Sequence, residues 1–397
     1  SERSQNTNDQ RSRSYMKSNS ISIVLLTRHR PIREQYDITD INIHYKIPSR
    51  CCTEMLEVPP QPRVVGECTI TQVEELCTVD NIEWVNTFKP PSKSNTDDPN
   101  AADQEMKQME KELQKLILIK IKLPDSAFWF EPPLMVLWDD EKQFWSTEFF
   151  QDVKYNEDVC TMQVRTTRLG VMGLAMNRYA NLPFQNWEIS PGAAPDTVKI
   201  KLCGAVVVAA ITIKGSQACV SQLQEGSKAV LTHLYGKYMK LNQLIKTLQF
   251  YGINLFPERD SYCYIDGLPH KHRPTEQHLY RCMALVAPAL SFTWSRWNLL
   301  AGEDKLVFQM KSLKDDEQTG PPLVLVTPSK TCILDCTEIS QAFSDKEPEG
   351  AKYYADLLQL AMGEFGDEMV QMVKNSNPTF IHTISHMIQC ASVISYC

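Results

Sequence analysis

The chain has 397 residues and a formal net charge of −7, with 43% hydrophobic and 22% charged residues. This length is sufficient for two or three domains, and the apolar fraction excludes a protein that is disordered throughout. The longest apolar stretch covers residues 202–213, which is shorter than the ~20 residues that a membrane-spanning helix needs. We therefore expect a soluble protein that does not bind or cross a membrane.

The cysteines point to a reducing environment. There are 13, an odd number, and they are scattered along the chain. A disulfide-stabilised domain would be shorter and denser in cysteine, so we expect reduced thiols in the cytoplasm. No basic start is followed by an apolar run and a cleavage site, which argues against secretion. The chain begins with Ser rather than Met, as a processed protein or a piece of a longer product would.

Charge is distributed unevenly along the chain. Residues 1–50 contain 9 Lys and Arg against 5 Asp and Glu, whereas the remainder has 32 against 43. An acidic body of this kind argues against nucleic acid as a partner, because nucleic-acid binding requires a basic surface. The basic segment, which includes Arg28, Arg30 and Arg33, is either a solvated tail or a contact for an anionic partner.

Residues 1–57 are predicted to form an extended, partly disordered basic arm. The first 20 residues have little to bury, and a short β-type run follows at 21–27. Apolar residues then alternate over 41–47, as in a half-buried strand. Residues 58–100 are rich in proline and are predicted to be a linker region.

Residues 101–226 are predicted to form a helix followed by an antiparallel β-sandwich. Residues 101–116 are rich in helix formers, and Met106, Met109 and Leu113 recur on one apolar face. Short strands punctuated by turn residues then follow, as in a sandwich. The predicted strands are the alternating end of 116–123, the hairpin 134–138 with 143–147, and then 160–166, 170–176, 187–189, 197–202, 205–210 and 212–214.

Residues 227–397 are predicted to form an α+β domain with C-terminal helices, so the whole chain is assigned to the α+β class. A period of 3.6 residues from Val230 to Leu248 indicates a long helix, with Gly252 as its C-terminal cap. Further strands are predicted at 290–294, 305–313, 323–327 and 331–336, and further helices at 275–286, 350–362, 364–374 and from Pro378 onward, with Asn377 as N-cap. The pattern leaves open whether the two β-rich parts share one core.

The chain lacks the usual motifs of nucleotide-binding and hydrolytic enzymes. It has 15 glycines, but neither G-x-G-x-x-G nor the P-loop pattern occurs, and both cradle phosphates with closely approaching backbone amides. The G-x-S-x-G turn of serine hydrolases is also missing from the sequence. We therefore predict a protein that is not an enzyme and has no cofactor.

The strongest metal candidate in the sequence is a set of three side chains, His382, His386 and Cys390, each four residues after the previous one. On a helix they project from nearly one face, and imidazole with thiolate suits zinc. However, Thr383 stands where the helix of a zinc protease carries its catalytic glutamate. Because apolar residues share the face, we favour a packed helix and keep a metal-dependent enzyme as the alternative hypothesis.

Aromatic residues are the most distinctive feature of the middle of the chain. Trp138 and Trp145 lie in a stretch that also holds several phenylalanines. In a β-sandwich such residues mostly fill the core, but Trp, Tyr and Arg also dominate the hot spots of protein interfaces. Stacking on carbohydrate or on bases is a third option, although it usually involves adjacent acidic or basic residues.

A series of motifs in residues 128–158 and 166–191 goes beyond fold class. Its members are the Glu131-Pro132-Pro133 entry, the Trp-rich hairpin FWFEPPLMVLWDDEKQFW, the Arg178-Tyr179 pair and the element Pro183-x-x-x-Trp187. In their order and spacing they resemble the C-terminal portion of the axonemal dynein intermediate-chain family of the cancer-susceptibility, or lung-adenoma-susceptibility, type. The resemblance extends from about Leu123 to the end of the chain.

The resemblance implies a non-catalytic subunit of the axoneme of cilia and flagella that supports their beating. Its partners would be inner-arm dynein, including intermediate and other chains, and the tubulin of doublet microtubules. The candidate interface residues are then Trp138, Trp145, Arg178, Tyr179, Pro183 and Trp187, together with Arg28, Arg30 and Arg33, which would face the acidic microtubule. A cytosolic β-sandwich adaptor unrelated to cilia is a further alternative.

Overall fold

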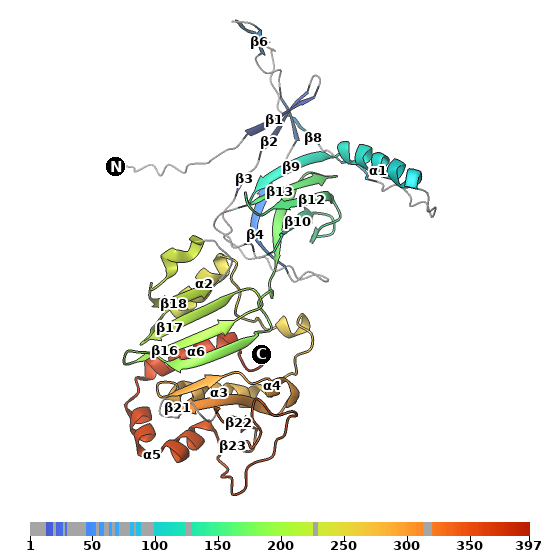
Figure 1. The fold of residues 1–397 in the computed structure, drawn as a ribbon. Coiled ribbons are helices and arrows are strands. Elements are labelled where there is room, and N and C mark those ends of the chain that lie inside the picture. Colours follow the sequence, from blue (N-terminus) through green and yellow to red (C-terminus); the bar gives the residue numbers. More distant parts are fainter. Residues whose placement is uncertain are drawn as a thin grey trace, which may run out of the picture. The chain divides into compact units, whose positions relative to one another are not determined.

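The computed structural model divides the chain into two compact units, Ser1–Asn177 (unit 1) and Arg178–Cys397 (unit 2), which are described separately (Figure 1). The described residues are 13–18, 21–26, 28–29, 45–52, 55–58, 63–65, 68–70, 80–82, 85–88, 99–123, 129, 131–224, 229–312 and 320–397. The domain boundary predicted between residues 226 and 227 lies within unit 2.

Unit 1 begins with short antiparallel strands. β1 (Arg13–Ser18), which lies in the segment expected to be disordered, pairs with β2 (Ile21–Leu26). The same sheet continues with β5 (Met55–Val58) and β8 (Asp80–Ile82), while β6 (Arg63–Val65) and β7 (Cys68–Ile70) pair separately. The described parts of the predicted linker 58–100 therefore include strands.

Two antiparallel sheets form a sandwich in unit 1. One has the order β12-β13-β9 and the other the order β11-β10-β14-β4-β3. The strands are β3 (Arg28–His29), β4 (Tyr45–Cys52), β9 (Ile117–Lys122), β10 (Leu134–Asp139), β11 (Phe144–Ser146), β12 (Phe150–Asn156), β13 (Thr161–Thr166) and β14 (Val171–Asn177). Ile119 and Val164 from the first sheet share a buried cluster with Leu137 and Leu174 from the second, which confirms the predicted sandwich.

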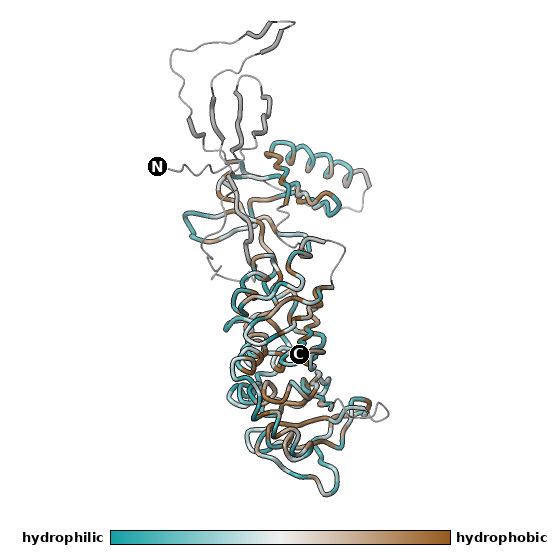
Figure 2. The backbone as a smooth tube through the Cα atoms, turned by 90° about the vertical axis from the view of Figure 1, so that its left-hand side faces the viewer, coloured by the Kyte–Doolittle hydropathy of each residue, from teal (hydrophilic) through white to brown (hydrophobic). Residues whose placement is uncertain are grey.

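The predicted helix before the sandwich is also confirmed, as α1 (Pro99–Gln114). Most of its described side chains are exposed, and it is drawn mostly in the hydrophilic colour in Figure 2. Met106 is exposed, whereas Leu113 is half-buried and Leu116, just past the helix, is buried. The apolar face is therefore covered only toward its C-terminal end.

Unit 2 is built on one nine-stranded antiparallel sheet with the order β19-β18-β17-β16-β15-β20-β21-β22-β23 (Figure 1). Its strands are β15 (Asn186–Pro191), β16 (Thr197–Cys203), β17 (Val208–Lys214), β18 (Gln217–Gln224), β19 (Met239–Lys240), β20 (Leu290–Thr293), β21 (Leu306–Ser312), β22 (Leu323–Val326) and β23 (Thr331–Ile333). Glu188 and Ile189 of β15 pair with Thr293 and Phe292 of β20. The β-rich parts on either side of the predicted boundary are thus one sheet.

The helices of unit 2 pack on this sheet and on one another. They are η1 (Ala229–Leu234), α2 (Leu241–Phe250), η2 (Ser261–Cys263), α3 (Arg273–Val286), α4 (Trp297–Leu300), α5 (Leu357–Asn375) and α6 (Pro378–Ala391). α6 contacts β17, and α3 contacts both α5 and α6. As predicted, Asn377 caps α6 by accepting a hydrogen bond from the backbone of Thr379 at 2.9 Å. No helix in the described residues combines the length and apolar character that a bilayer crossing requires.

The long helix predicted from Val230 to Leu248 is wrong, because the structure divides this segment into η1, β19 and α2. Gly236 has a positive φ of 68° and its backbone N–H donates to Val220 at 3.0 Å. Met239 then pairs with Ala218 as part of the sheet. The backbone pairing with β18 therefore prevents one continuous helix, although the apolar residues of this segment recur with a helical period. Gly252, with a φ of 87°, follows α2 as predicted.

Candidate interface around Arg178 and Tyr179

The turn that follows β14 is fixed to distant parts of unit 2 by buried amides. The Asn254 side chain donates to the Arg178 carbonyl at 2.8 Å, and the Asn181 side chain donates to the Asn254 carbonyl at 3.3 Å. Asn181 also accepts from the backbone N–H of Val207 at 2.9 Å. A Cβ at Gly204 would lie 2.8 Å from the Cβ of Asn181, so only glycine fits there. These hydrogen bonds hold the turn that carries Arg178 and Tyr179 against the segments around Asn254 and Val207.

Arg178 and Tyr179 form an ionic and aromatic network with Glu258 and Asp260, which we call the Arg178 network. The Arg178 guanidinium lies 3.4 Å from Glu258 and 3.7 Å from Asp260, and the Tyr179 hydroxyl donates to Asp260 at 3.1 Å. Burial raises the pKa of Tyr179, which Arg178 opposes, so this hydroxyl stays protonated at neutral pH. The network therefore combines two ion pairs with a hydrogen bond from the Tyr179 hydroxyl.

Residues 257–267, which we call the tyrosine loop, carry exposed aromatic rings beside this network. Tyr264 is 40% exposed and stacks on Tyr179 with ring centroids 6.1 Å apart. Tyr262 is 54% exposed and meets the His270 ring edge-on at 5.2 Å. Beneath them, Ser261 hydrogen-bonds the hydroxyl of Tyr396. Exposed tyrosines on an ordered support, next to an arginine, are typical of interface hot spots.

The tyrosine loop and the acidic partners of Arg178 were not predicted from the sequence. Glu258 and Asp260 lie about 80 residues after Arg178 and Tyr179 in the sequence. They belong to a segment without periodic apolar residues. The one available signal was the closely spaced tyrosines at 262 and 264.

Most of the predicted aromatic interface residues have packing roles. The side chains of Trp145, Tyr179 and Trp187 are at most 4% exposed. Trp145 meets the half-buried Trp138 edge-on across the β10–β11 hairpin, with centroids 5.4 Å apart. The folded chain covers these three side chains, and their contact with a partner stays a prediction. Trp138, Arg178 and the exposed Pro183 stay predictions.

The predicted basic contact falls largely outside the described residues. Arg28 is the first residue of β3, but nothing is described of its side chain. Arg30 and Arg33 lie outside the described residues altogether. Their role as a contact for an acidic partner stays a prediction.

The weak metal candidate on α6, His382, His386 and Cys390, comes together only in part. The rings of His382 and His386 are stacked with centroids 5.9 Å apart. Burial, and next the charge of His382, lower the pKa of His386, while burial raises that of the Cys390 thiol. In the described part of the chain, the donor atoms of these three residues do not converge as a metal site requires. Buried neighbours such as Met387 agree with the packed-helix interpretation.

A different trio does converge in the described part of the chain: His278, Cys282 and Asp356, whose donor atoms all lie within 4.8 Å of one another. His278 and Cys282 are one turn apart on α3, and Asp356 is the N-cap of α5. Burial, with a further contribution from Asp356, raises the pKa of the Cys282 thiol to about 11.

One match to known proteins covers β11 to β14 of the sandwich and all strands of the nine-stranded sheet. A family model described as Cancer susceptibility candidate 1 C-terminal matches residues 141–348. The chain belongs to this family. The matched residues include the Arg178 network and the tyrosine loop, so both belong to the Cancer susceptibility candidate 1 C-terminal region.

Curated relatives match over more of the chain. A protein of Ciona intestinalis named "Dynein axonemal intermediate chain 7 homolog" is 27% identical over 341 residues, which is 81% of this chain and 45% of the relative. Human and zebrafish (Danio rerio) proteins named "Dynein axonemal intermediate chain 7" are each 28% identical over 70% of this chain, covering 39% and 38% of their own lengths. The chain thus spans less than half of these relatives, and the resemblance inferred from its motifs is confirmed.

Proposed function

We propose that this chain is a non-catalytic subunit of the ciliary or flagellar axoneme that associates with axonemal dynein. The family match over residues 141–348 carries the proposal, because the curated relatives reported above are all named as axonemal dynein intermediate chains or a homolog of one. In finer detail, the chain would join inner-arm dynein to doublet microtubules and support beating. Such a role requires docking surfaces rather than a catalytic centre.

The tyrosine loop and the Arg178 network are the docking surface that we assign to a dynein chain. Their exposed rings offer apolar area at low entropic cost, since a tyrosine loses only two torsions on binding. The carboxylates of Glu258 and Asp260 are partly exposed and offer acceptors around these rings. An aromatic centre with a polar rim is the usual anatomy of a specific interface.

We expect Tyr262→Ala to weaken the binding of an axonemal dynein preparation to the purified chain. A hot-spot residue contributes at least about 2 kcal/mol, which corresponds to a Kd roughly thirtyfold higher. Surface plasmon resonance with immobilised chain would measure it. Tyr353→Ala is the matched control, because Tyr353 is an exposed tyrosine of unit 2 outside the loop. Equal losses for both variants would remove the tyrosine loop from the proposal.

The basic arm is the surface that we assign to tubulin, whose outer face is acidic. Replacing Arg28, Arg30 and Arg33 by Gln should weaken co-sedimentation with doublet microtubules, and salt should reduce the difference from the unmodified chain. Exposed ion pairs contribute about 0.2–1 kcal/mol each, so a severalfold loss is expected. The control, with Lys237, Lys240 and Lys246 replaced by Gln, makes the same change of charge on exposed residues of unit 2.

The co-sedimentation assay also separates the alternative functions. A chain that binds neither doublet microtubules nor dynein, at any salt concentration, would favour a cytosolic adaptor unrelated to cilia. Turnover of a small molecule that is lost on His386→Ala would favour the metal-dependent enzyme.

A further inference from the structure

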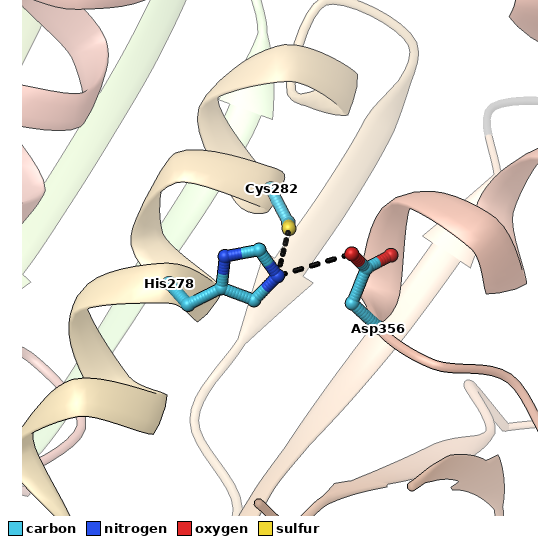
Figure 3. Close-up of side chains that lie close together, drawn as sticks. All are labelled: His278, Cys282 and Asp356. Carbon is cyan, nitrogen blue, oxygen red and sulfur yellow. Dashed lines mark hydrogen bonds and ion pairs between the residues drawn. The ribbon is translucent and has the colours of Figure 1, made fainter. Parts of the chain in front are cut away.

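Two helices of unit 2 meet at a cluster of side chains that the sequence analysis did not single out. His278 and Cys282 project from α3 toward Asp356, at the start of α5 (Figure 3). The His278 Nε2 lies 3.0 Å from Asp356 Oδ2 and 3.6 Å from Cys282 Sγ. One imidazole nitrogen thus faces both an oxygen and a sulfur donor.

The spacing of these atoms suits a tetrahedral zinc ion. With Zn–N and Zn–O bonds of about 2.0–2.2 Å and Zn–S bonds of about 2.3 Å, two ligand atoms of one zinc lie about 3.3–3.6 Å apart. The two separations from Nε2, 3.0 and 3.6 Å, are close to this range, and no pair of donor atoms exceeds 4.8 Å. Small side-chain adjustments would bring all three donors to bonding distance.

The surroundings already orient two of the three donors. Asp356 uses Oδ1 to accept the backbone N–H of Gln359 at 2.9 Å, which leaves Oδ2 directed at His278. The Cys282 sulfur accepts a hydrogen bond from the backbone of Leu358, in the first turn of α5. Hydrogen bonds of this kind hold ligands in place around bound metals and raise affinity.

The formal charge and the solvent exposure of the three side chains also fit a divalent metal ion. A thiolate, a carboxylate and a neutral imidazole together carry a formal charge of −2, which a Zn²⁺ ion neutralises. Cys282 is buried, whereas the side chain of His278 is 56% exposed and that of Asp356 is 23% exposed. The cluster is therefore closed on the thiol side and open to solvent on the imidazole side, where a water molecule can complete the tetrahedron.

We propose that His278, Cys282 and Asp356 bind one zinc ion, which links α3 to the start of α5. The ion replaces the thiol proton of Cys282, so binding releases a proton. Its role is to hold these two helices together, since α3 and α5 already pack on each other. The proposal stands independently of the docking surfaces.

Cobalt(II) is a suitable probe, because a thiolate bound to it gives a charge-transfer absorption in the near ultraviolet. The full chain, freed of metal by dialysis against a chelator, should bind one equivalent of Co²⁺ with this absorption, and Zn²⁺ should displace it. Cys282→Ser should abolish the absorption. Cys263→Ser, which removes an exposed thiol outside the trio, should leave it unchanged.

Asp356→Asn provides a second variant whose fold is preserved. Asparagine is a good N-cap and can still accept from Gln359, but it removes the charged ligand, so the affinity for Co²⁺ should fall by at least about tenfold. Zinc should raise the midpoint of thermal unfolding of the unmodified chain and of Cys263→Ser, but not of Cys282→Ser. Folded protein without the absorption at saturating cobalt, or an absorption that survives Cys282→Ser, would overturn the proposal.

Discussion

Replacing Trp187 by alanine is expected to lower the free energy of unfolding of unit 2 by about 3–5 kcal/mol, the usual cost of removing a large aromatic side chain from a core. Trp187 is 1% exposed and lies on β15, which is hydrogen-bonded to β16 on one side and β20 on the other. Its carbonyl also accepts the backbone N–H of Trp294 at 3.1 Å. Guanidinium unfolding followed by circular dichroism would measure the loss.

The same variant decides between the interface role predicted for Trp187 and the core position that the structure shows for it. A core residue should lose stability first and binding only as a consequence of unfolding. The control is Phe250→Ala, an exposed aromatic residue on α2, which should change the free energy of unfolding by no more than about 0.5 kcal/mol. A Trp187→Ala variant with unchanged stability but weakened dynein binding would restore its interpretation as an interface residue.

Replacing Tyr280 by phenylalanine is expected to destabilise unit 2 by about 2–3 kcal/mol, although it removes a single oxygen atom. The buried hydroxyl donates to Glu276 at 2.7 Å and accepts the backbone N–H of Ile394 at 2.9 Å. Phenylalanine leaves this N–H without its acceptor in the interior, at a cost of about 1–3 kcal/mol, and removes a hydrogen bond from a carboxylate. Chemical denaturation at neutral pH would measure the change.

The Tyr280 hydroxyl is important because it joins α3 to the segment that follows α6. Glu276 also accepts the backbone N–H of Ser395 at 3.0 Å and its hydroxyl at 2.7 Å. Tyr353→Phe, at an exposed tyrosine, is the matched control and should be close to neutral. If Tyr280→Phe were equally neutral, this hydroxyl would contribute little, and the segment after α6 would be held by its other contacts, such as the hydrogen bond that the Asn298 side chain donates to the Ile394 carbonyl at 2.7 Å.

The candidate interface was only half predictable from the sequence. Arg178 and Tyr179 could be selected because the motif that contains them resembles a family. Their partners could not, because Glu258 and Asp260 approach them only when the chain folds back over about 80 residues. The zinc cluster was equally hidden, since Asp356 meets His278 from a separation of 78 residues. In contrast, the pair His382 and His386 could be selected from the sequence, because both residues lie on one helix, four positions apart.

The sequence by itself determined the elements whose signals are local. The hairpin of β10 and β11, with its charged turn, and α6, with Asn377 as cap, follow from side-chain alternation and capping chemistry within a few residues. Such signals act through the neighbouring backbone and do not depend on the remainder of the fold.

Only the tertiary structure decided which strands share a sheet and which helical patterns persist. The pairing of Ile189 with Phe292 joins two β-rich parts into one nine-stranded sheet, and the pairing of Met239 with Ala218 interrupts a segment whose apolar period favoured a helix. The physical reason is that periodicity reports which side chains become buried, whereas backbone hydrogen bonds between distant strands depend on the partners that the whole fold brings together.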